Sequence, residues 1–362
     1  MDWMKLTARR MGGAPEEVRP EKRPDISKMT RLCYNENMYG MAPTVRQALR
    51  DSLDRAHQYA DFSASALKQR LAELHRLGIG QVVTAAGSSA LIDMLGVTFL
   101  EPGEEVLYCA PTFGAFRDMA VYSGGVPVEL PLTADQRFDL DALLAAVTDR
   151  TKIIVVCNPN NPTGTYRPIS QLRDFIRRVP DDVLVVVDEA YMEFATEPDC
   201  VSAIGLLKEM PEKPLMILKT FSKFYAMAGI RVGYALGPEK LMQVMNRCAA
   251  AWNVSLPAQE AAMAALDAQE YYAETRNQIV ETRAWLSAEM RALGCEVWPS
   301  QTNFIYFDAH IPPAELTAAL KQRGVLISTF EKSRVSVGTR AQCEQFLGAL
   351  RDVLVDLRRE HI

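Results

Sequence analysis

The chain has 362 residues, of which 48% are hydrophobic and 23% are charged, and both fractions are ordinary for a globular protein. A chain of this length predicts two domains, with enough residues to build a core without disulfide bonds. The net charge of −5 argues against a nucleic-acid partner, because no basic face is expected.

Several further classes are excluded by short patterns. Apolar runs such as VLVVV, just before Asp188, are long enough for a strand and too short to span a bilayer, so no membrane association is expected. The first ten residues, MDWMKLTARR, lack the apolar segment of a secretory signal. Seven scattered cysteines without a C-x-x-C pair indicate reduced thiols and a cytoplasmic protein. None of the four histidines is paired at metal-ligand spacing, so no metal site is expected.

The first two thirds of the chain alternate between strand and helix patterns. After a mixed segment over 1–43, two helices are expected within 44–76, on either side of a polar turn at 59–63. Apolar runs predict strands at 104–110, 151–158, 181–190, 215–220 and 232–237, with helical periodicity at 138–147 and 168–178. This order predicts an α/β fold of three αβα layers, with a mostly parallel sheet that helices cover on both faces.

The pattern changes after about residue 240. Helices are expected at 241–252, 257–292, 313–323 and 340–359, and strands at 302–308, 324–329 and 333–339. Helices mixed with strands in this way predict a smaller α+β domain. We therefore divide the chain into an N-terminal arm (1–43) that packs with the small domain, a large domain (44–245) and a small C-terminal domain (246–362).

Polar residues follow several of the predicted strands, where ligands bind in open α/β sheets. Gly87, Ser88 and Ser89 open a helix, and backbone N–H groups at a helix start bind phosphate, although a serine helix cap has the same pattern. The segment NPNNPTG contains Asn161 and indicates a tight turn directly after a strand. Asp188 ends an apolar strand, three residues before Tyr191, and is either buried with a cationic partner or solvated at the rim.

Lys223 lies in the segment KTFSKFYAMAGIRVGY, with Thr220 and Ser222 before it and Arg231 eight residues later. A lysine amine forms a Schiff base with an aldehyde, and pyridoxal phosphate (PLP) is a phosphorylated aldehyde. The PLP ring also needs an acid at its nitrogen, a hydrogen-bond donor at its phenolic oxygen, a phosphate site and an aromatic cover. The chain offers Asp188, then Asn161 with Tyr191, then the phosphate candidates Gly87, Ser88, Ser89, Ser222 and Arg231, and Phe113 as the cover.

Taken together, these motifs resemble those of fold-type I PLP-dependent enzymes of aminotransferase class I/II, and most closely the histidinol-phosphate aminotransferase group. The resemblance runs from residue 7 to residue 342 and is carried by YNENMYG, PTFGAF, NPNNPTG, VVDEAYMEF, KTFSKFYAMAGIRVGY and SRVSVGT, in that order.

The resemblance implies a role for each matched residue. Lys223 would carry the internal aldimine and move a proton between the substrate Cα and the cofactor. Asp188 would pair with the pyridinium nitrogen, Asn161 and Tyr191 would hold the phenolic oxygen, and Phe113 would stack on the ring. The phosphate would be bound by Gly87, Ser88, Ser222 and Arg231, and Ser89 and Thr220 are further cofactor-binding candidates.

Two further sets of residues follow from the resemblance. Tyr59 is similar to the tyrosine that reaches the phosphate in a neighbouring subunit, which implies a homodimer. Arg334 is similar to the arginine that binds the substrate carboxylate through two parallel hydrogen bonds. Asn35, Asn37 and Tyr39, in the arm, and Asn161 are expected near the substrate; Asn35 and Asn37 are equally compatible with turn residues.

The chain departs from the histidinol-phosphate enzymes at two substrate positions. Ser328 stands where that group usually has a second arginine, and Lys5 replaces a tyrosine before ARRMGG. Neither reproduces the planar fork of an arginine. We therefore expect an aminotransferase that moves the amino group of an aromatic or apolar L-amino acid, or of histidinol phosphate, to a 2-oxo acid. Phe113, Tyr39, Trp252 and Ile327 are candidates for an apolar pocket.

Two other functions are compatible with the same cofactor residues. One is a decarboxylase of the threonine-phosphate decarboxylase type, because the sequence does not show which bond at Cα stands perpendicular to the ring. The other is a PLP-binding protein without turnover, which would not need the lysine and its proton-transfer neighbours.

Overall fold

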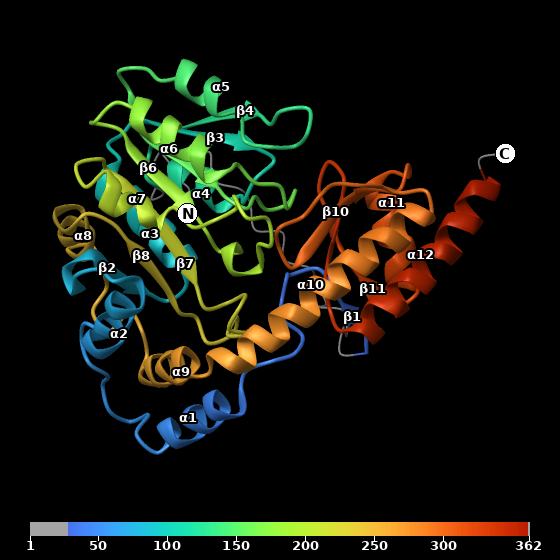
Figure 1. The fold of residues 1–362 in the computed structure, drawn as a ribbon, viewed down its shortest axis with the longest axis horizontal. Helices are drawn as coiled ribbons and strands as arrows, with labels where there is room; N and C mark the ends of the chain where they lie inside the picture. The colour runs from blue at the N-terminus through green and yellow to red at the C-terminus, as the bar shows by residue number, and fades with distance from the viewer. Residues whose placement is uncertain (1–27, 361–362) are drawn as a thin grey trace, which may run out of the picture.

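The computed structural model describes residues 28–360, which form two connected parts (Figure 1). The larger part contains a sheet of seven strands in the order β2-β8-β7-β6-β5-β3-β4. Their bounds are β2 Val82–Ala85, β3 Glu105–Ala110, β4 Val126–Pro131, β5 Thr151–Cys157, β6 Leu184–Asp188, β7 Leu215–Thr220 and β8 Gly233–Leu236. All neighbouring pairs are parallel except those of β8, which runs antiparallel to β2 and β7.

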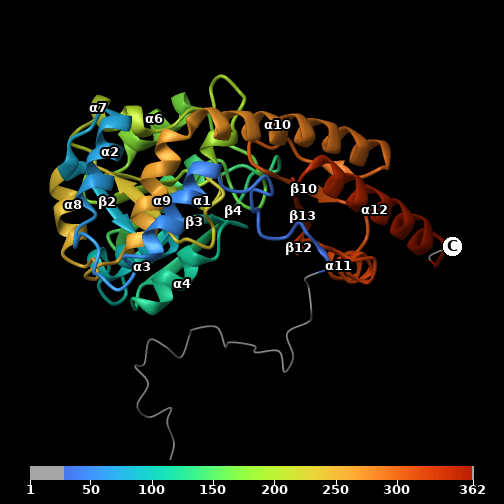
Figure 2. The same ribbon diagram turned by 90° about the horizontal axis from the view of Figure 1, so that it is seen from below.

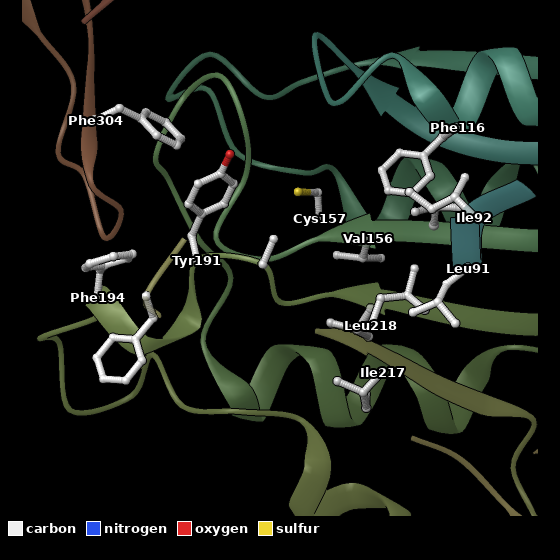
Figure 3. Close-up of a cluster of buried hydrophobic side chains, with 14 of the residues drawn as sticks. Leu91, Ile92, Phe116, Val156, Cys157, Tyr191, Phe194, Ile217, Leu218 and Phe304 are labelled. Carbon is white, nitrogen blue, oxygen red and sulfur yellow. The ribbon is translucent and has the colours of Figure 1, made fainter. Parts of the chain in front are cut away.

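Helices lie on both faces of this sheet, as the near-continuous apolar strands predict. They are α2 Ser65–His75, α3 Ser88–Phe99, α4 Ala115–Tyr122, α5 Leu140–Ala145, α6 Ile169–Arg178, α7 Ile204–Glu209 and α8 Glu239–Asn246. Figure 3 shows Leu91 and Ile92 of α3 against Val156 of β5 and Leu218 of β7, all fully buried. The predicted three-layer α/β architecture with a mostly parallel sheet is confirmed.

The smaller part is built on an antiparallel sheet in the order β12-β13-β10-β9. These strands are β9 Glu296–Val297, β10 Phe304–Asp308, β12 Ser328–Thr329 and β13 Ser333–Ser336, with β11 Val325–Leu326 paired to β1 Thr30–Arg31. The helices α11 Pro313–Gln322 and α12 Arg340–Glu360 pack on this side. The long helix α10, Gln269–Ala292, connects the two parts (Figure 1).

The segment that begins near residue 256 packs against residues 43–53 rather than within the smaller part. Helix α9, Leu256–Asp267, packs on α1, Pro43–Leu53, and also contacts α2 (Figure 2). The pairing of β1 with β11 places residues 30–31 with the smaller part. The three-way division at residues 43 and 245 stays a prediction.

Four strands were not predicted, namely the two-residue strands β1 and β9 together with β2 and β4, and one helix is shorter than predicted. The strand pattern misses β2, which is only four residues long, and β4, an edge strand that is half-exposed and contains Pro127 and Pro131. The expected helix over 241–252 ends at Asn246. Beyond it, Trp252 takes a left-handed φ of 53° and its indole Nε1 donates to the Ala60 carbonyl at 3.1 Å, so the chain turns instead of continuing the helix.

Within residues 28–360, no helix combines the length and apolar character that a membrane span needs.

Candidate active site

The predicted site residues converge on the carboxyl end of the large sheet. Asp188 is the last residue of β6, Thr220 is the last residue of β7, and Asn161 lies in the loop after β5. Because parallel strands end at the same edge of a sheet, their end residues become neighbours in space. The start of α3 lies at the same edge, because Gly233 of β8 packs against Gly87 and Ser88.

Lys223 is held by the N-terminal arm. Its Nζ donates a hydrogen bond of 2.8 Å to the Tyr34 carbonyl and lies 5.7 Å from the centre of the Tyr191 ring. Burial lowers the pKa of Lys223 to about 8; the positive charges of Arg334 and Arg231 act in the same direction, while Glu36 and Asp188 oppose it. A lysine amine with a lowered pKa is the reactive form that a nucleophile or a general base requires.

Asp188 is a buried carboxylate without a cation at hydrogen-bond distance among residues 28–356. Its side chain is 2% exposed, and Oδ1 accepts a hydrogen bond of 3.0 Å from the Ala190 N–H. Burial raises the pKa of Asp188 to about 6, against the opposing effects of Ala190, Lys219 and Lys223. A carboxylate in this state favours a cationic partner, because a positive charge at its oxygens would offset the desolvation.

Tyr191 and Asn161 lie on the side of the smaller part. The Tyr191 hydroxyl accepts a hydrogen bond of 3.0 Å from Asn35 Nδ2, and its ring packs edge-on against Phe304 of β10 (Figure 3). Asn161 Oδ1 accepts a hydrogen bond from Arg334. Burial raises the pKa of Tyr191 to about 12, so its hydroxyl stays protonated at neutral pH and remains a donor.

Polar and cationic groups gather where α3 begins. Helix α3 has no side-chain cap at Gly87, so its first N–H groups have no intrahelical acceptors and carry the positive end of the helix dipole. Arg231 has a left-handed φ of 66° and lies so close to Gly87 that a Cβ there would overlap its guanidinium. Arg231 also donates to Ser222 Oγ at 3.3 Å, and Thr220 Oγ1 lies 2.9 Å from the same oxygen.

Ser88 and Ser89 are the first two residues of α3, so the structure brings the predicted phosphate residues to one place, together with Thr220. Phe113 lies in the loop after β3, half-buried and edge-on to Phe116 at 6.0 Å. That loop is joined to the loop after β5 by a hydrogen bond of 2.8 Å between Thr112 and Asn160. The predicted ring cover and the predicted ring-oxygen donor therefore lie on connected loops.

Arg334 of β13 is a buried guanidinium at the boundary of the two parts. It donates to the Cys33 carbonyl at 2.7 Å and to Ser328 Oγ at 2.9 Å, besides Asn161. Its Cζ lies 5.2 Å from the centre of the Phe304 ring and 4.9 Å from that of Phe330. Its Nε is buried and has no hydrogen-bond partner within the described part of the chain.

Other predicted residues lie elsewhere. Tyr59 is 80% exposed and stacks on Trp252 with ring centres 4.4 Å apart, so neither ring joins the Lys223 cluster within one chain. The Tyr39 phenol lies near Thr282 of α10. Ile327 is buried between β11 and β12, next to Ser328. Lys5 is outside the described residues.

Asn37 stays near the site, since its Nδ2 donates to the Phe224 carbonyl at 3.0 Å. Within residues 28–356, no cluster of three or more metal-ligating side chains is present.

Three further contributors were not assigned from the sequence. Glu36, whose negative charge acts on the pKa of Lys223, lies between two asparagines already matched in YNENMYG. Gly233 has no room for a side chain, because a Cβ would lie 2.5 Å from the Ser88 nitrogen. The buried Lys219, inside the quoted KTFSKFY segment, bridges Glu189 at 3.4 Å and Glu193 at 2.8 Å beneath the site. All three residues lie within motifs that carry the family resemblance, and this position was the signal by which the sequence could have identified them.

Comparison with known proteins identifies the family. Residues 27–350 match the model of aminotransferase class I and II. A histidinol-phosphate aminotransferase from Carboxydothermus hydrogenoformans is 35% identical, covering 95% of each chain. An aromatic amino acid aminotransferase from Streptomyces avermitilis is 36% identical, covering 88% of each. The crystal structure of histidinol-phosphate aminotransferase from Sinorhizobium meliloti, in complex with pyridoxal-5′-phosphate, has a TM-score of 0.88, is 27% identical, and covers 97% of this chain and 98% of that one.

The chain therefore belongs to the aminotransferase class I and II family. The predicted family, fold and class of enzyme are confirmed. The alternative of a decarboxylase is not favoured, because these relatives are named aminotransferases. The alternative without turnover is set aside on the same ground.

Proposed function

We propose that the chain transfers the amino group of an aromatic or apolar L-amino acid to a 2-oxo acid, with PLP bound at the carboxyl end of the large sheet. Family membership confirms the expected enzyme class and, with it, the expected cofactor. The donor class and the role of each residue are the proposed part.

The side chains present fit PLP at three separate points. The unpaired, buried Asp188 carboxylate suits a protonated ring nitrogen. The uncapped start of α3 with Arg231 and Ser222 suits a phosphate. Lys223, with its pKa lowered to about 8, suits attachment of an aldehyde. Tyr191 and Asn161 would hold the ring oxygen, and Phe113 would cover the ring.

When bound, PLP supplies a ring that withdraws electrons from the donor Cα. The chain's own residues would do the remaining work. Asp188 would keep the ring nitrogen protonated, and Arg334 would orient the donor by its α-carboxylate. Lys223 Nζ would then take the proton from the donor Cα as a general base. The same amine would return that proton on the same face of the cofactor as a general acid. The Tyr34 carbonyl, which accepts from Lys223 Nζ, keeps that amine at the arm side of the site.

The observation that carries the donor class is the surroundings of Arg334. A buried guanidinium with an unpartnered Nε suits a carboxylate, which accepts two parallel hydrogen bonds. The rings of Phe304 and Phe330 beside it provide apolar walls. The Ser328 hydroxyl already binds both Arg334 and the Cys33 carbonyl, at 2.9 and 2.6 Å, so it adds no charge for a second anion.

Arg334→Lys is expected to lower kcat/KM for the preferred amino acid by a factor on the order of 10² or more, because a lysine keeps the charge and loses the planar fork. The loss should appear mainly in KM. Steady-state kinetics with amino acids and with the matching amines that lack the carboxylate would check this. The amines should lose little between wild type and variant; an equal loss for both would mean that Arg334 only supports the fold.

Absorbance titration of the purified holoenzyme tests the function itself. An amino acid that is a donor should shift the cofactor band to that of the amine form, and a 2-oxo acid should restore it. Phenylalanine, tyrosine, leucine, histidinol phosphate and threonine phosphate form the panel. Release of carbon dioxide without this reversible shift would contradict the transaminase proposal.

Histidinol phosphate is the second candidate donor, favoured by the names of several relatives. Its phosphate ester stands where an amino acid has its carboxylate, so Arg334 would meet the phosphate and the imidazole would take the place of the aromatic side chain. A kcat/KM for histidinol phosphate far above that of every amino acid would select this candidate.

The attachment of PLP is expected to accelerate with pH. The neutral amine is the nucleophile, and Lys223 is mostly neutral only above its pKa of about 8. Stopped-flow absorbance of the cofactor-free protein mixed with PLP should give an observed rate that rises between about pH 7 and pH 9 and then levels. A rate independent of pH over that range would contradict this assignment.

We further propose a homodimer that is cytoplasmic. Tyr59 and Phe62 are 80% and 62% exposed and gather with Trp252, so these rings would meet a second copy, with Tyr59 reaching its phosphate site. Sedimentation equilibrium should give twice the 40.3 kDa of one chain. The cytoplasm is supported by Cys33, Cys109, Cys157, Cys200 and Cys343, which are buried and form no disulfide.

A further inference from the structure

A pocket of about 330 Å³ opens between the N-terminal arm and the loop that follows Lys223. The arm side is formed by Arg31, Glu36, Asn37 and Met38, and the loop side by Ser222, Ala226, Ala228 and Gly229. Its volume lies at the lower end of the range of small-molecule sites, roughly 300–1,000 Å³. That is enough for the side chain of an amino acid.

The only charged side chains in this lining are Arg31 and Glu36, which form an ion pair of 2.7 Å between Nη2 and Oε1. The pair is not fully engaged, because the buried Arg31 Nε has no hydrogen-bond partner in the described part of the chain. The Arg31 guanidinium also lies over the Tyr34 ring, 5.7 Å from its centre. Arg31 therefore retains one buried donor that no partner in the described part of the chain uses.

Glu36 is close to the reactive amine as well as to Arg31. Its negative charge acts on Lys223, and two nearby residues of the arm, Tyr34 and Asn37, hold this segment against the loop around Lys223. Tyr34 accepts from Lys223 Nζ at 2.8 Å, and Asn37 donates to the Phe224 carbonyl at 3.0 Å. Both bonds involve backbone or buried groups, so Glu36 is positioned by the fold rather than by its own ion pair.

We propose that the Arg31–Glu36 pair selects the amino donor by the charge at the far end of its side chain. This inference rests on the proposed function and names what discriminates among donors. While the pair is intact, its two charges cancel, so this side of the pocket favours a donor with a neutral side chain. A donor with a distal anion would have to take Arg31 from Glu36, and one with a distal cation would have to take Glu36 from Arg31.

An ion pair at the surface with no such role is the simpler explanation, and exposed pairs contribute little to stability. Two features favour selection. The pair lines a pocket of ligand size, and Glu36 lies in the arm segment between Tyr34, which accepts from Lys223 Nζ, and Asn37, which donates to the Phe224 carbonyl. A pair that serves only the fold would not change which donors are accepted when one charge is removed.

The test uses two neutralising variants of the holoenzyme, Glu36→Gln and Arg31→Gln, with phenylalanine, glutamate and lysine as donors. Glu36→Gln leaves Arg31 unpaired, so kcat/KM for glutamate relative to phenylalanine should rise about tenfold, the lower end of the discrimination that one side-chain contact provides. Arg31→Gln leaves Glu36 unpaired, so the ratio for lysine should rise by a similar factor and that for glutamate should fall. Glu36→Asp keeps the charge and should retain most of the wild-type preference.

Binding supplies a readout that does not depend on turnover. Calorimetry with 3-phenylpropanoate, glutarate and 6-aminohexanoate, which have no α-amino group to react, should show the same opposite shifts in Kd. Melting curves of each variant establish that it is folded before the ratios are compared.

Opposite shifts in the two variants would support the proposal. Ratios within about twofold of wild type in both, or shifts in the same direction, would overturn it. If the wild type transfers no amino group from any donor, the proposed function fails while the binding arm still decides the role of the pair.

Discussion

Lys223→Ala should lower kcat for amino transfer by a factor on the order of 10³, within the range that a positioned general base contributes. Lys223 Nζ is held at 2.8 Å from the Tyr34 carbonyl and has a pKa of about 8, so it is the amine best placed to take a proton from a donor. Its charge is flanked by Arg334, Arg231, Glu36 and Asp188. The other lysine near the site, Lys219, is paired with Glu189 and Glu193 instead.

The readout should include more than activity. Borohydride reduction, followed by mass spectrometry, should attach the cofactor to residue 223 of the wild type and leave the variant unlabelled. A small primary amine added to the solution should restore part of the activity, because it can replace the missing base. Lys208→Ala, an exposed lysine of α7, is the matched control and should change neither measurement. Wild-type activity in the Lys223 variant would refute every catalytic role proposed here.

Asp188→Asn should have opposite effects on activity and on the cofactor-free fold. Activity should fall by a factor on the order of 10², because a neutral amide does not stabilise a protonated ring nitrogen. The cofactor-free protein should become more stable at neutral pH, because the ionised carboxylate is buried without a cation and its pKa is raised to about 6. The rise of the Asp188 pKa from 3.8 to about 6 corresponds to roughly 2–3 kcal/mol.

The pH dependence of this stability difference follows from the raised pKa of Asp188. A pKa raised in the folded state means that the ionised carboxylate opposes folding above about pH 6, and that protonation removes this penalty as the pH falls toward the ordinary value of 3.8. The stability difference between variant and wild type should therefore be full at pH 7 and shrink below pH 6. Denaturant titrations of both cofactor-free proteins at several pH values would measure it.

The adjacent carboxylate gives a matched comparison. Glu189 is also fully buried, yet it accepts from Ser202 Oγ and the Ala203 N–H, both at 2.6 Å, and pairs with Lys219 at 3.4 Å. Glu189→Gln should therefore destabilise the cofactor-free protein, because it leaves Lys219 less compensated. If both variants shifted stability in the same direction, pairing would not be what distinguishes the two acids.

Much of the site was predictable because it is local in sequence. Asp188, Thr220 and Asn161 end or follow apolar strands, and the edge of a parallel sheet collects such residues without further information. Gly87 to Ser89 at the start of α3 follow the same logic. The order of the motifs around Lys223 and Arg334 then indicated the family, which the matches confirm.

Other parts depended on contacts that no local pattern encodes. The strand β4 shows little alternation because it is a half-exposed edge. The left-handed turn at Trp252 lies within the expected helix and is accompanied by a hydrogen bond to Ala60, 192 residues away in the chain. The position of Asn35 is likewise set by Tyr191 and Ser336, to which it is hydrogen-bonded.

By itself, the sequence determined the class of fold, the family and the residues that suit PLP, because strand periodicity and short motifs depend on neighbours along the chain. Only the tertiary structure decided which charged side chains have a partner of opposite charge. It left Asp188 without a cation and gave Glu189 one, and it paired Glu36 of the arm with Arg31 while its charge acts on the pKa of Lys223. Electrostatic energies depend on distance and burial in three dimensions, and both are fixed only when segments remote in sequence pack together.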